Sequence, residues 1–137
     1  TLYQLASMHK GIVVGTGNKV EDFGVGFYTK YGDGGVDISP IGDCLKTEVW
    51  EIGQTLGIAQ EIIDADPTDG LWDDGRTDEG QLGMTYAELE QAMHYQEQQI
   101  IPEDPKELDN YNKYVKLNTV NGHKMRGIPV CHVGEIK

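Results

Sequence analysis

Apolar residues at helical spacing open the chain. Leu2, Leu5 and Met8 recur at intervals of three residues, which predicts a helix over the first nine positions. Gly11–Gly15 then encloses three apolar, β-branched residues between two glycines. Such a run is typical of a strand that is buried on both faces of a parallel sheet. After a turn at residues 16–18, we expect a second helix that ends near Tyr31.

The order helix, strand, turn, helix predicts an α/β fold. Residues 36–40 run extended to a proline and form a short strand at most. Asp43 is placed like an N-cap, and the helix after it should end at Gly57, where a C-terminal glycine belongs. One stripe of this helix should face inward, with the residues Leu45, Val49, Ile52 and Leu56.

Acidic residues gather in one segment of the chain. Residues 61–80 contain eight acids and one cation, Arg76, with a proline and several glycines among them. This composition predicts a surface loop, and we expect residues 64–83 to form a mobile acidic lid. Mutual repulsion among its carboxylates should keep the lid open when no ligand is bound.

Two further helices follow the acidic segment. Thr85 and Glu88 form a capping box, which predicts a helix to about Tyr95. Another helix should begin in residues 101–105, and the tail from Lys124 to Lys137 should be extended. The inner face of the last helix is expected to carry Leu108, Tyr111 and Val115.

Composition narrows the possible partners. The 137 residues suffice for one domain, and 23 Asp and Glu against 11 Lys and Arg give a net charge of -12. This charge predicts no nucleic acid partner. No apolar run approaches the ~20 residues of a membrane span, so no membrane partner is expected. The two cysteines show no disulfide pattern, which favours a reducing, cytoplasmic location.

Several polar residues are candidates for ligand binding, each with a structural alternative. Gly15–Glu21 follows the predicted strand, where α/β sheets bind ligands, but tight turns also use glycine for steric reasons. Glu21 could bind a metal or complement the helix dipole. Lys30, Asp37 and Lys46 flank the glycine-rich loop, and the two lysines could contact phosphate or be solvated surface residues.

Near the carboxyl end, His123 and Lys124 could contact a ligand or cap the last helix. Patterns for a covalent nucleophile or a zinc protease, such as GxSxG or HExxH, do not occur in the sequence. Any phosphate-bearing ligand must therefore be held by a few placed cations, backbone N–H groups or a metal.

Six segments in this order and spacing resemble ammonia-dependent NAD synthetases: GTGNKVE, FYTKYGDGGVDISPIGD, LKTEVWEIGQTLG, DPTDGLW, TDEGQLGMTY and GHKMRGIPV. The resemblance implies an adenine nucleotide alpha hydrolase-like fold of the ATP-pyrophosphatase type, with a Rossmann-like parallel sheet flanked by helices. It also implies a homodimer that uses ATP and Mg²⁺ to adenylate the carboxylate of nicotinic acid adenine dinucleotide (deamido-NAD). Ammonia then displaces AMP to give NAD.

The same resemblance implies roles for individual residues. Glu21 would bind Mg²⁺, and Lys46 would be the catalytic residue. ATP would be contacted by Thr16, Lys46 and Thr68, and deamido-NAD by Lys30, Asp37, His123 and Lys124. This allocation agrees with the need to aim cations at a developing pyrophosphate.

The family's SGGxDS loop, whose Asp is a further magnesium ligand, does not occur in this sequence. We therefore expect residues 1–137 to be a single partial domain, the carboxyl-terminal portion of an NAD synthetase with the amino-terminal half missing. We also expect this chain to be inactive alone. Two alternatives remain open: a non-catalytic dimerisation or nucleotide-binding module, and an ATP-pyrophosphatase with another acceptor. Whether ammonia arrives free or from glutamine is open as well.

Overall fold

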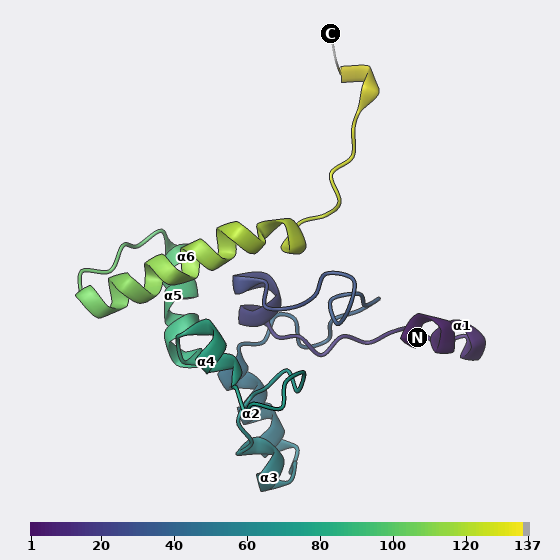
Figure 1. Ribbon diagram of the computed structural model, residues 1–137, viewed down its shortest axis with the longest axis horizontal. Coiled ribbons are helices and arrows are strands. Elements are labelled where there is room, and N and C mark those ends of the chain that lie inside the picture. The colour runs from purple at the N-terminus through teal and green to yellow at the C-terminus, as the bar shows by residue number, and fades with distance from the viewer. Residues whose placement is uncertain (136–137) are drawn as a thin grey trace.

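The computed structural model describes residues 1–135, and helices dominate it (Figure 1). Among these residues, no helix is both long enough and apolar enough to cross a membrane. The elements in chain order are α1 (Leu2–His9), the π-helix η1 (Lys19–Val25), α2 (Lys46–Thr55), α3 (Gln60–Ile63), α4 (Asp78–Leu82), α5 (Tyr86–Gln98), α6 (Pro105–Met125) and the 3₁₀ helix η2 (Val133–Glu135).

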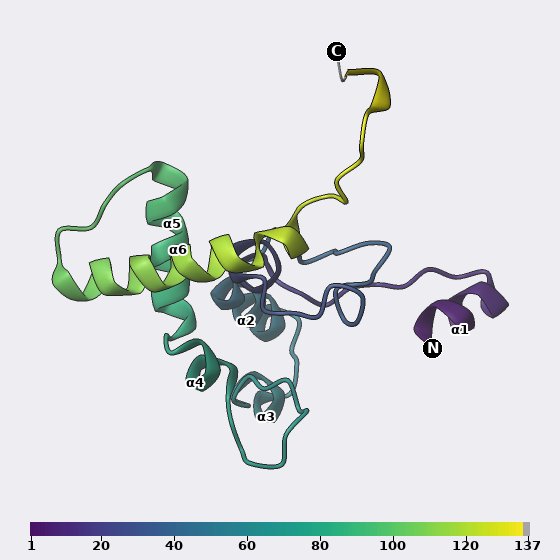
Figure 2. The same ribbon diagram turned by 45° about the horizontal axis from the view of Figure 1, so that its top comes forward.

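The core lies where η1, α5 and α6 meet, and α6 passes across α5 in both views (Figures 1 and 2). By contrast, α1 and the segment after α6 extend away from this helical body, and α1 has no buried residue. Burying large apolar side chains supplies most of the stability of such a body. The largest fully buried side chains are those of Val20, Val25, Tyr86, Leu89 and Tyr114.

The capping box that begins α5 is confirmed. The Thr85 hydroxyl accepts the Glu88 N–H at 3.2 Å, and the Glu88 carboxylate accepts the Thr85 N–H at 2.9 Å. These two bonds satisfy backbone donors that the first helical turn leaves free. The helix then continues to Gln98, three residues beyond the expected end at Tyr95.

The inner face predicted for the last helix is confirmed only in part, since Val115 packs against the core but the fully buried side chain is that of Tyr114. Leu108, Tyr111 and Val115 are only partly buried, whereas Tyr114 is 1% exposed. The Tyr114 ring packs against Gly24 of η1, where an added Cβ would lie 3.1 Å from its hydroxyl oxygen. A contact with a distant element therefore set the orientation of this helix, which its own apolar spacing does not encode.

The second predicted helix is shorter than expected and has π geometry. It ends at Val25, because Gly26 adopts a left-handed conformation with φ of 64°. At Gly26 a Cβ would lie 2.6 Å from the Cβ of Asn121, so the close approach of α6 also requires glycine. The expectation of a helix to about Tyr31 was wrong for this reason.

The expected parallel sheet is not confirmed. Among the described residues, one isolated parallel bridge joins Val14 to Ile38, supported by an N–H···O bond of 2.7 Å from Gly15 to Ile38. Burial on both faces was also wrong, because Val13 is 6% exposed whereas Ile12 and Val14 are more than half exposed. Residues 36–40 contain a bend at Asp37 and a turn at Pro40, so the expected extended course is seen only in part, whereas the parallel direction of pairing agrees with expectation.

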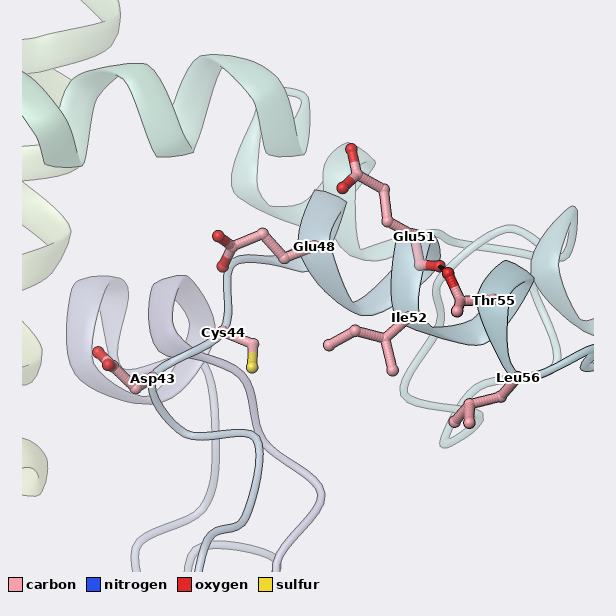
Figure 3. Close-up of a pocket in the computed structure, with 7 residues that line it drawn as sticks. All are labelled: Asp43, Cys44, Glu48, Glu51, Ile52, Thr55 and Leu56. Carbon is pink, nitrogen blue, oxygen red and sulfur yellow. Dashed lines mark hydrogen bonds between the residues drawn. The ribbon is translucent and has the colours of Figure 1, made fainter.

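The helix expected after Asp43 begins later. Its N-cap is Leu45, whose N–H donates to the Glu48 carboxylate at 2.7 Å. The glycine end is confirmed, since Gly57 has φ of 70°. The apolar stripe is only half inward, and its outer part lines an open groove of about 570 Å³, where Cys44, Ile52 and Leu56 are seen along one side of α2 (Figure 3).

The acidic segment is partly helical. It contains α3 and α4, while residues 64–77 between them are irregular and almost all exposed. The Asp78 N–H donates to the Pro67 carbonyl at 2.9 Å and closes the base of this loop. The mobility expected of residues 64–83 stays a prediction.

His123 and Lys124 lie in the last turn of α6 rather than after it. The chain beyond Met125 is mostly extended, as expected, with a 3₁₀ turn at Val133–Glu135. The expectation for the tail also includes residues 136 and 137, which lie outside the described residues.

Candidate functional site

A polar cavity of about 320 Å³ lies between η1, the start of α2 and the acidic loop. Its wall contains all four residues predicted to bind ATP and Mg²⁺, namely Thr16, Glu21, Lys46 and Thr68. These residues are up to 52 positions apart in the sequence, from 16 to 68. The fold brings them together, although their contacts with a ligand stay predictions.

A partly buried ion pair lies in this wall. The Lys46 ammonium is 3.1 Å from Oε1 of Glu21, and the two side chains are 19% and 16% exposed. The Tyr86 hydroxyl donates to the same Glu21 oxygen, and the Lys46 nitrogen lies 4.8 Å from the centre of the Tyr86 ring. Burial, followed by the hydrogen bond to Glu21, raises the pKa of Tyr86, so its hydroxyl stays protonated and donates.

Local sequence explains how Glu21 is placed. Asn18 is 2% exposed and caps η1, because its side-chain oxygen accepts the Glu21 N–H at 3.1 Å. The Lys19 N–H donates to the Cys44 carbonyl at 2.8 Å, which joins the start of η1 to the residues before α2. Glu21 from the first turn of η1 and Lys46 from the start of α2 therefore line the same cavity.

The cavity carries excess acid. Asp22 packs against Gly17, where an added Cβ would overlap its carboxylate, so a larger residue at position 17 would force the Asp22 side chain to move. Burial and then the charges of Glu21 and Asp33 raise the pKa of Asp22 to about 6. Burial and then Glu21 also raise the pKa of Asp78, whose Oδ1 is buried without a hydrogen bond to the described residues. The cavity is therefore suited to a cationic group.

The carboxylates of this cavity can bind magnesium only together with the phosphates of a ligand. Within residues 1–135, no group of three or more His, Cys, Asp or Glu side chains is arranged to hold a metal ion. Mg²⁺ usually binds through one or two carboxylates together with substrate phosphates and water. Glu21 can be such a carboxylate, and Asp78, one oxygen of which has no hydrogen-bond partner in the described structure, lines the same cavity.

A second cavity, of about 590 Å³, adjoins the first and shares Phe27, Asp33 and Asp69 with it. Lys124 lines it, and its ammonium donates to the carbonyls of Gly26 and Tyr28 at 2.9 and 2.8 Å. Lys124 therefore caps carbonyls of another segment, which differs from the expected cap of its own helix. Its role towards a ligand stays a prediction.

Three of the four residues predicted to contact deamido-NAD come together at the end of α6. The Lys30 ammonium donates to the His123 carbonyl at 2.6 Å, next to Lys124. Asp37 lies elsewhere, where its carboxylate accepts the Val13 N–H at 2.7 Å. In the described structure Asp37 is not part of the wall of either cavity.

Sequence reasoning missed residues that organise these cavities. Asn118 and Asn121 donate to the carbonyls of Gly24 and Val25 at 2.7 and 2.8 Å. Together with Lys124 they recur every three residues, and this polar stripe along the helix was a usable signal. For Tyr86 the sequence offered no comparable signal, since an aromatic residue in a first helical turn is most often core.

Comparisons with known proteins agree on one family. The family model described as NAD synthase matches residues 1–127. A curated NH(3)-dependent NAD(+) synthetase of Methanosarcina acetivorans is 40% identical over 134 residues, which cover 94% of this chain and 52% of that protein. A protein of the same name from Methanococcoides burtonii is 50% identical over 92 residues, covering 67% of this chain and 34% of that protein.

Two solved structures also resemble the chain. The structure described as NMN synthetase from Francisella tularensis has a TM-score of 0.78 and 32% identity, covering 95% of this chain and 50% of that one. NH3-dependent NAD synthetase from Campylobacter jejuni has a TM-score of 0.66 and 21% identity, which shows the shared fold, over 96% of this chain and 50% of that one. The chain spans about half the length of the curated relatives that match nearly all of it. Since the family model covers nearly the whole sequence, the chain belongs to the NAD synthase family.

Proposed function

We propose that this chain contributes the nucleotide-handling part of a ligase that forms a carbon–nitrogen bond in NAD biosynthesis. Its reaction would be the ATP-dependent amidation of deamido-NAD to NAD, through an adenylated intermediate attacked by ammonia. The observation that carries this proposal is the convergence of Thr16, Glu21, Lys46 and Thr68 on one cavity.

In this proposal, Lys46 stabilises the charge that develops on the departing pyrophosphate. Its ammonium is held by Glu21 and by the face of Tyr86, so it needs little rearrangement as the charge forms. Mg²⁺, when bound, would supply further positive charge at the phosphates, with Glu21 as its protein ligand. No protein nucleophile is needed, because ATP activates the carboxylate.

Thr68 must change partner to contact ATP. Its hydroxyl now donates to the Arg76 carbonyl at 3.2 Å and accepts the Gly70 N–H at 3.2 Å. Both bonds lie within the acidic loop and are exposed, so each is weak in water. We propose that ATP replaces the Arg76 carbonyl as the acceptor and thereby draws the loop over the cavity.

The second cavity is the proposed position of deamido-NAD, since Lys124 lines it and Lys30 and His123 lie beside it. Asp37 would join this set only through a substrate that extends beyond the cavity. A homodimeric assembly, a cytoplasmic location and the absence of nucleic acid and membrane partners are further predictions from the resemblance.

One observation favours a second acceptor. The Francisella tularensis relative, at 32% identity, is described as an NMN synthetase. The mononucleotide counterpart of deamido-NAD is therefore an alternative substrate for the same amidation. Relative rates with the two acceptors will distinguish these functions.

The experiment joins this chain to the part of a longer relative that it does not match. In the Methanosarcina acetivorans synthetase, the 134 matched residues are replaced by this chain, and amide formation is measured with ATP, Mg²⁺, ammonium and either acceptor. We expect the chimera to convert deamido-NAD, and the 137-residue chain alone to show no turnover. A folded chimera that converts neither acceptor, beside an active parent enzyme, would contradict the proposed function.

A further inference from the structure

Tyr86 connects three parts of the site. It is 1% exposed, and its hydroxyl lies within hydrogen-bonding distance of Glu21 on η1 and of Oδ2 of Asp78 on α4, the latter at 3.3 Å. Its backbone N–H donates to the Glu79 carboxylate at 2.8 Å. One residue at the start of α5 thus contacts both η1 and the helix that ends the acidic loop.

The ring of Tyr86 makes separate contacts. The Lys46 ammonium lies 4.8 Å from the ring centre, and Trp50 packs edge-on with the centroids 5.9 Å apart. These contacts belong to the ring rather than the hydroxyl, so phenylalanine can retain them. The two parts of the side chain can therefore be tested independently.

We propose that Tyr86 is a positioning residue, whose hydroxyl fixes the Glu21 carboxylate beside Lys46 and couples this pair to α4. The inference rests on the proposed function for its consequence in phosphate chemistry, while the geometry stands by itself. Tyr86 touches neither phosphate nor acceptor in this scheme.

The chemistry of a shared oxygen explains why the hydroxyl matters. Oε1 of Glu21 accepts from both Tyr86 and Lys46, which restricts the carboxylate to one orientation. In a partly buried site such bonds are stronger and mutually supportive. Without the hydroxyl, the carboxylate regains rotational freedom and the Lys46 ammonium loses a fixed partner.

The test measures how accessible Lys46 is in the 137-residue chain. An amine-reactive ester is added at neutral pH, and modification of each lysine is followed by mass spectrometry, with exposed Lys113 as the internal standard. Tyr86→Phe should raise the modification rate of Lys46 about two- to tenfold, the loss expected for one hydrogen bond. Lys113 should be unaffected.

Tyr114→Phe is the matched control, since Tyr114 is also 1% exposed in the same core and has no hydrogen bond to Glu21 or Asp78 in the described structure. It should leave the Lys46 rate unchanged. An unchanged Lys46 rate in folded Tyr86→Phe would overturn the proposal. If that variant does not fold, NMR of the unaltered chain decides: a slowly exchanging Tyr86 hydroxyl proton supports the proposal, and solvent-like exchange overturns it.

Kinetics separate this inference from the proposed function. In the chimera, Tyr86→Phe should lower kcat while the KM for deamido-NAD stays nearly constant, as expected when a group acts on the transition state. Loss through KM alone would contradict a positioning role. If the unaltered chimera makes no amide, the proposed function fails, whereas the labelling result for Lys46 still stands or falls on its own.

Discussion

The two sides of the polar cavity are built differently. Glu21 and Lys46 project from helices that pack on a core including Val20, Tyr86 and Leu89, all at most 1% exposed. Thr68 projects from the exposed residues 64–77, which are held by short-range bonds of their own. Segments with few buried apolar contacts open at low free energy. We infer that the helical side is preformed and that ligand completes the loop side.

Residues 64–77 form hydrogen bonds mainly among themselves, and these bonds do not attach the loop to the helical core. Arg76 binds Asp74 through its guanidinium and stacks on Trp72, with its carbon Cζ 4.5 Å from the ring centre. All three side chains are exposed, and exposed pairs of this kind contribute little. The anchoring contacts come at the loop base, where the Asp78 N–H meets the Pro67 carbonyl.

Paired truncations should show the largest difference between the two sides. Leu89 is 0% exposed, and Leu89→Ala should lower the free energy of unfolding by about 3 kcal/mol, because it removes core contacts and leaves a cavity. Leu71 is 76% exposed, and Leu71→Ala should change the free energy of unfolding by less than about 0.5 kcal/mol. Urea denaturation of both variants measures this, and equal losses would contradict the comparison.

Removing the charge of Lys46, on the helical side of the cavity, should have the next largest effect. This effect is on the catalytic rate rather than on stability. In the chimera, Lys46→Ala should lower kcat roughly 10²-fold and affect the KM for deamido-NAD less, since the charge acts mainly on the transition state. Steady-state kinetics measures both constants. An unchanged kcat would identify Lys46 as a structural partner of Glu21 only.

The sequence predicted what local interactions determine. The capping box of Thr85 and Glu88 lies within four residues, and it marks the start of α5 correctly. The resemblance selected Thr16, Glu21, Lys46 and Thr68, and the fold does place them on one cavity. Their selection came from matched motifs, since none of these residues was distinctive by itself.

The sequence could not predict what distant contacts determine. The end of η1 at Gly26 depends on Asn121, which is 95 positions away. The inward position of Tyr114 depends on the space above Gly24. Asp43 was predicted as an N-cap, but the helix begins two residues later. There Glu48 accepts the Leu45 N–H, and residue preference alone does not decide between such neighbouring positions.

A glycine substitution tests the contact that ends η1. Gly26→Ala should lower the free energy of unfolding by about 2 kcal/mol, because it adds a clash with Asn121 to the strain of a left-handed alanine. Gly57→Ala is the control, since Gly57 has a similar φ of 70° but nothing within 4 Å of an added Cβ. It should cost about 1 kcal/mol. Equal costs in thermal or urea unfolding would show that α6 does not constrain this turn.

A smaller effect than that of Gly26→Ala is expected in the first turn of α5, where Glu88 lies. Hydrogen bonds from Lys106 and then from the Thr85 backbone lower the pKa of Glu88 to about 2, below its ordinary value of 4.5. The folded state therefore favours the ionised form, so this stabilisation is present above pH 4.5 and is lost as the pH falls towards 2. Glu88→Gln should cost about 1 kcal/mol at pH 7, after allowance for solvent screening.

The difference in stability between Glu88→Gln and the unaltered chain should shrink progressively below pH 4.5. Urea denaturation at several pH values between 7 and 2 measures it. A difference that does not depend on pH would show that glutamine loses packing or capping rather than charge.

Hydrogen exchange of the chimera tests the central claim most directly, because it compares both sides of the cavity in one sample. Without ligand, amides of residues 64–77 should exchange rapidly, while those of α5 from Tyr86 to Met93 should be strongly protected. Adding ATP with deamido-NAD should raise protection in residues 64–77 and leave α5 nearly unchanged. Strong and equal protection of residues 64–77 with and without ligands would contradict a preformed helical side completed by a ligand-ordered loop.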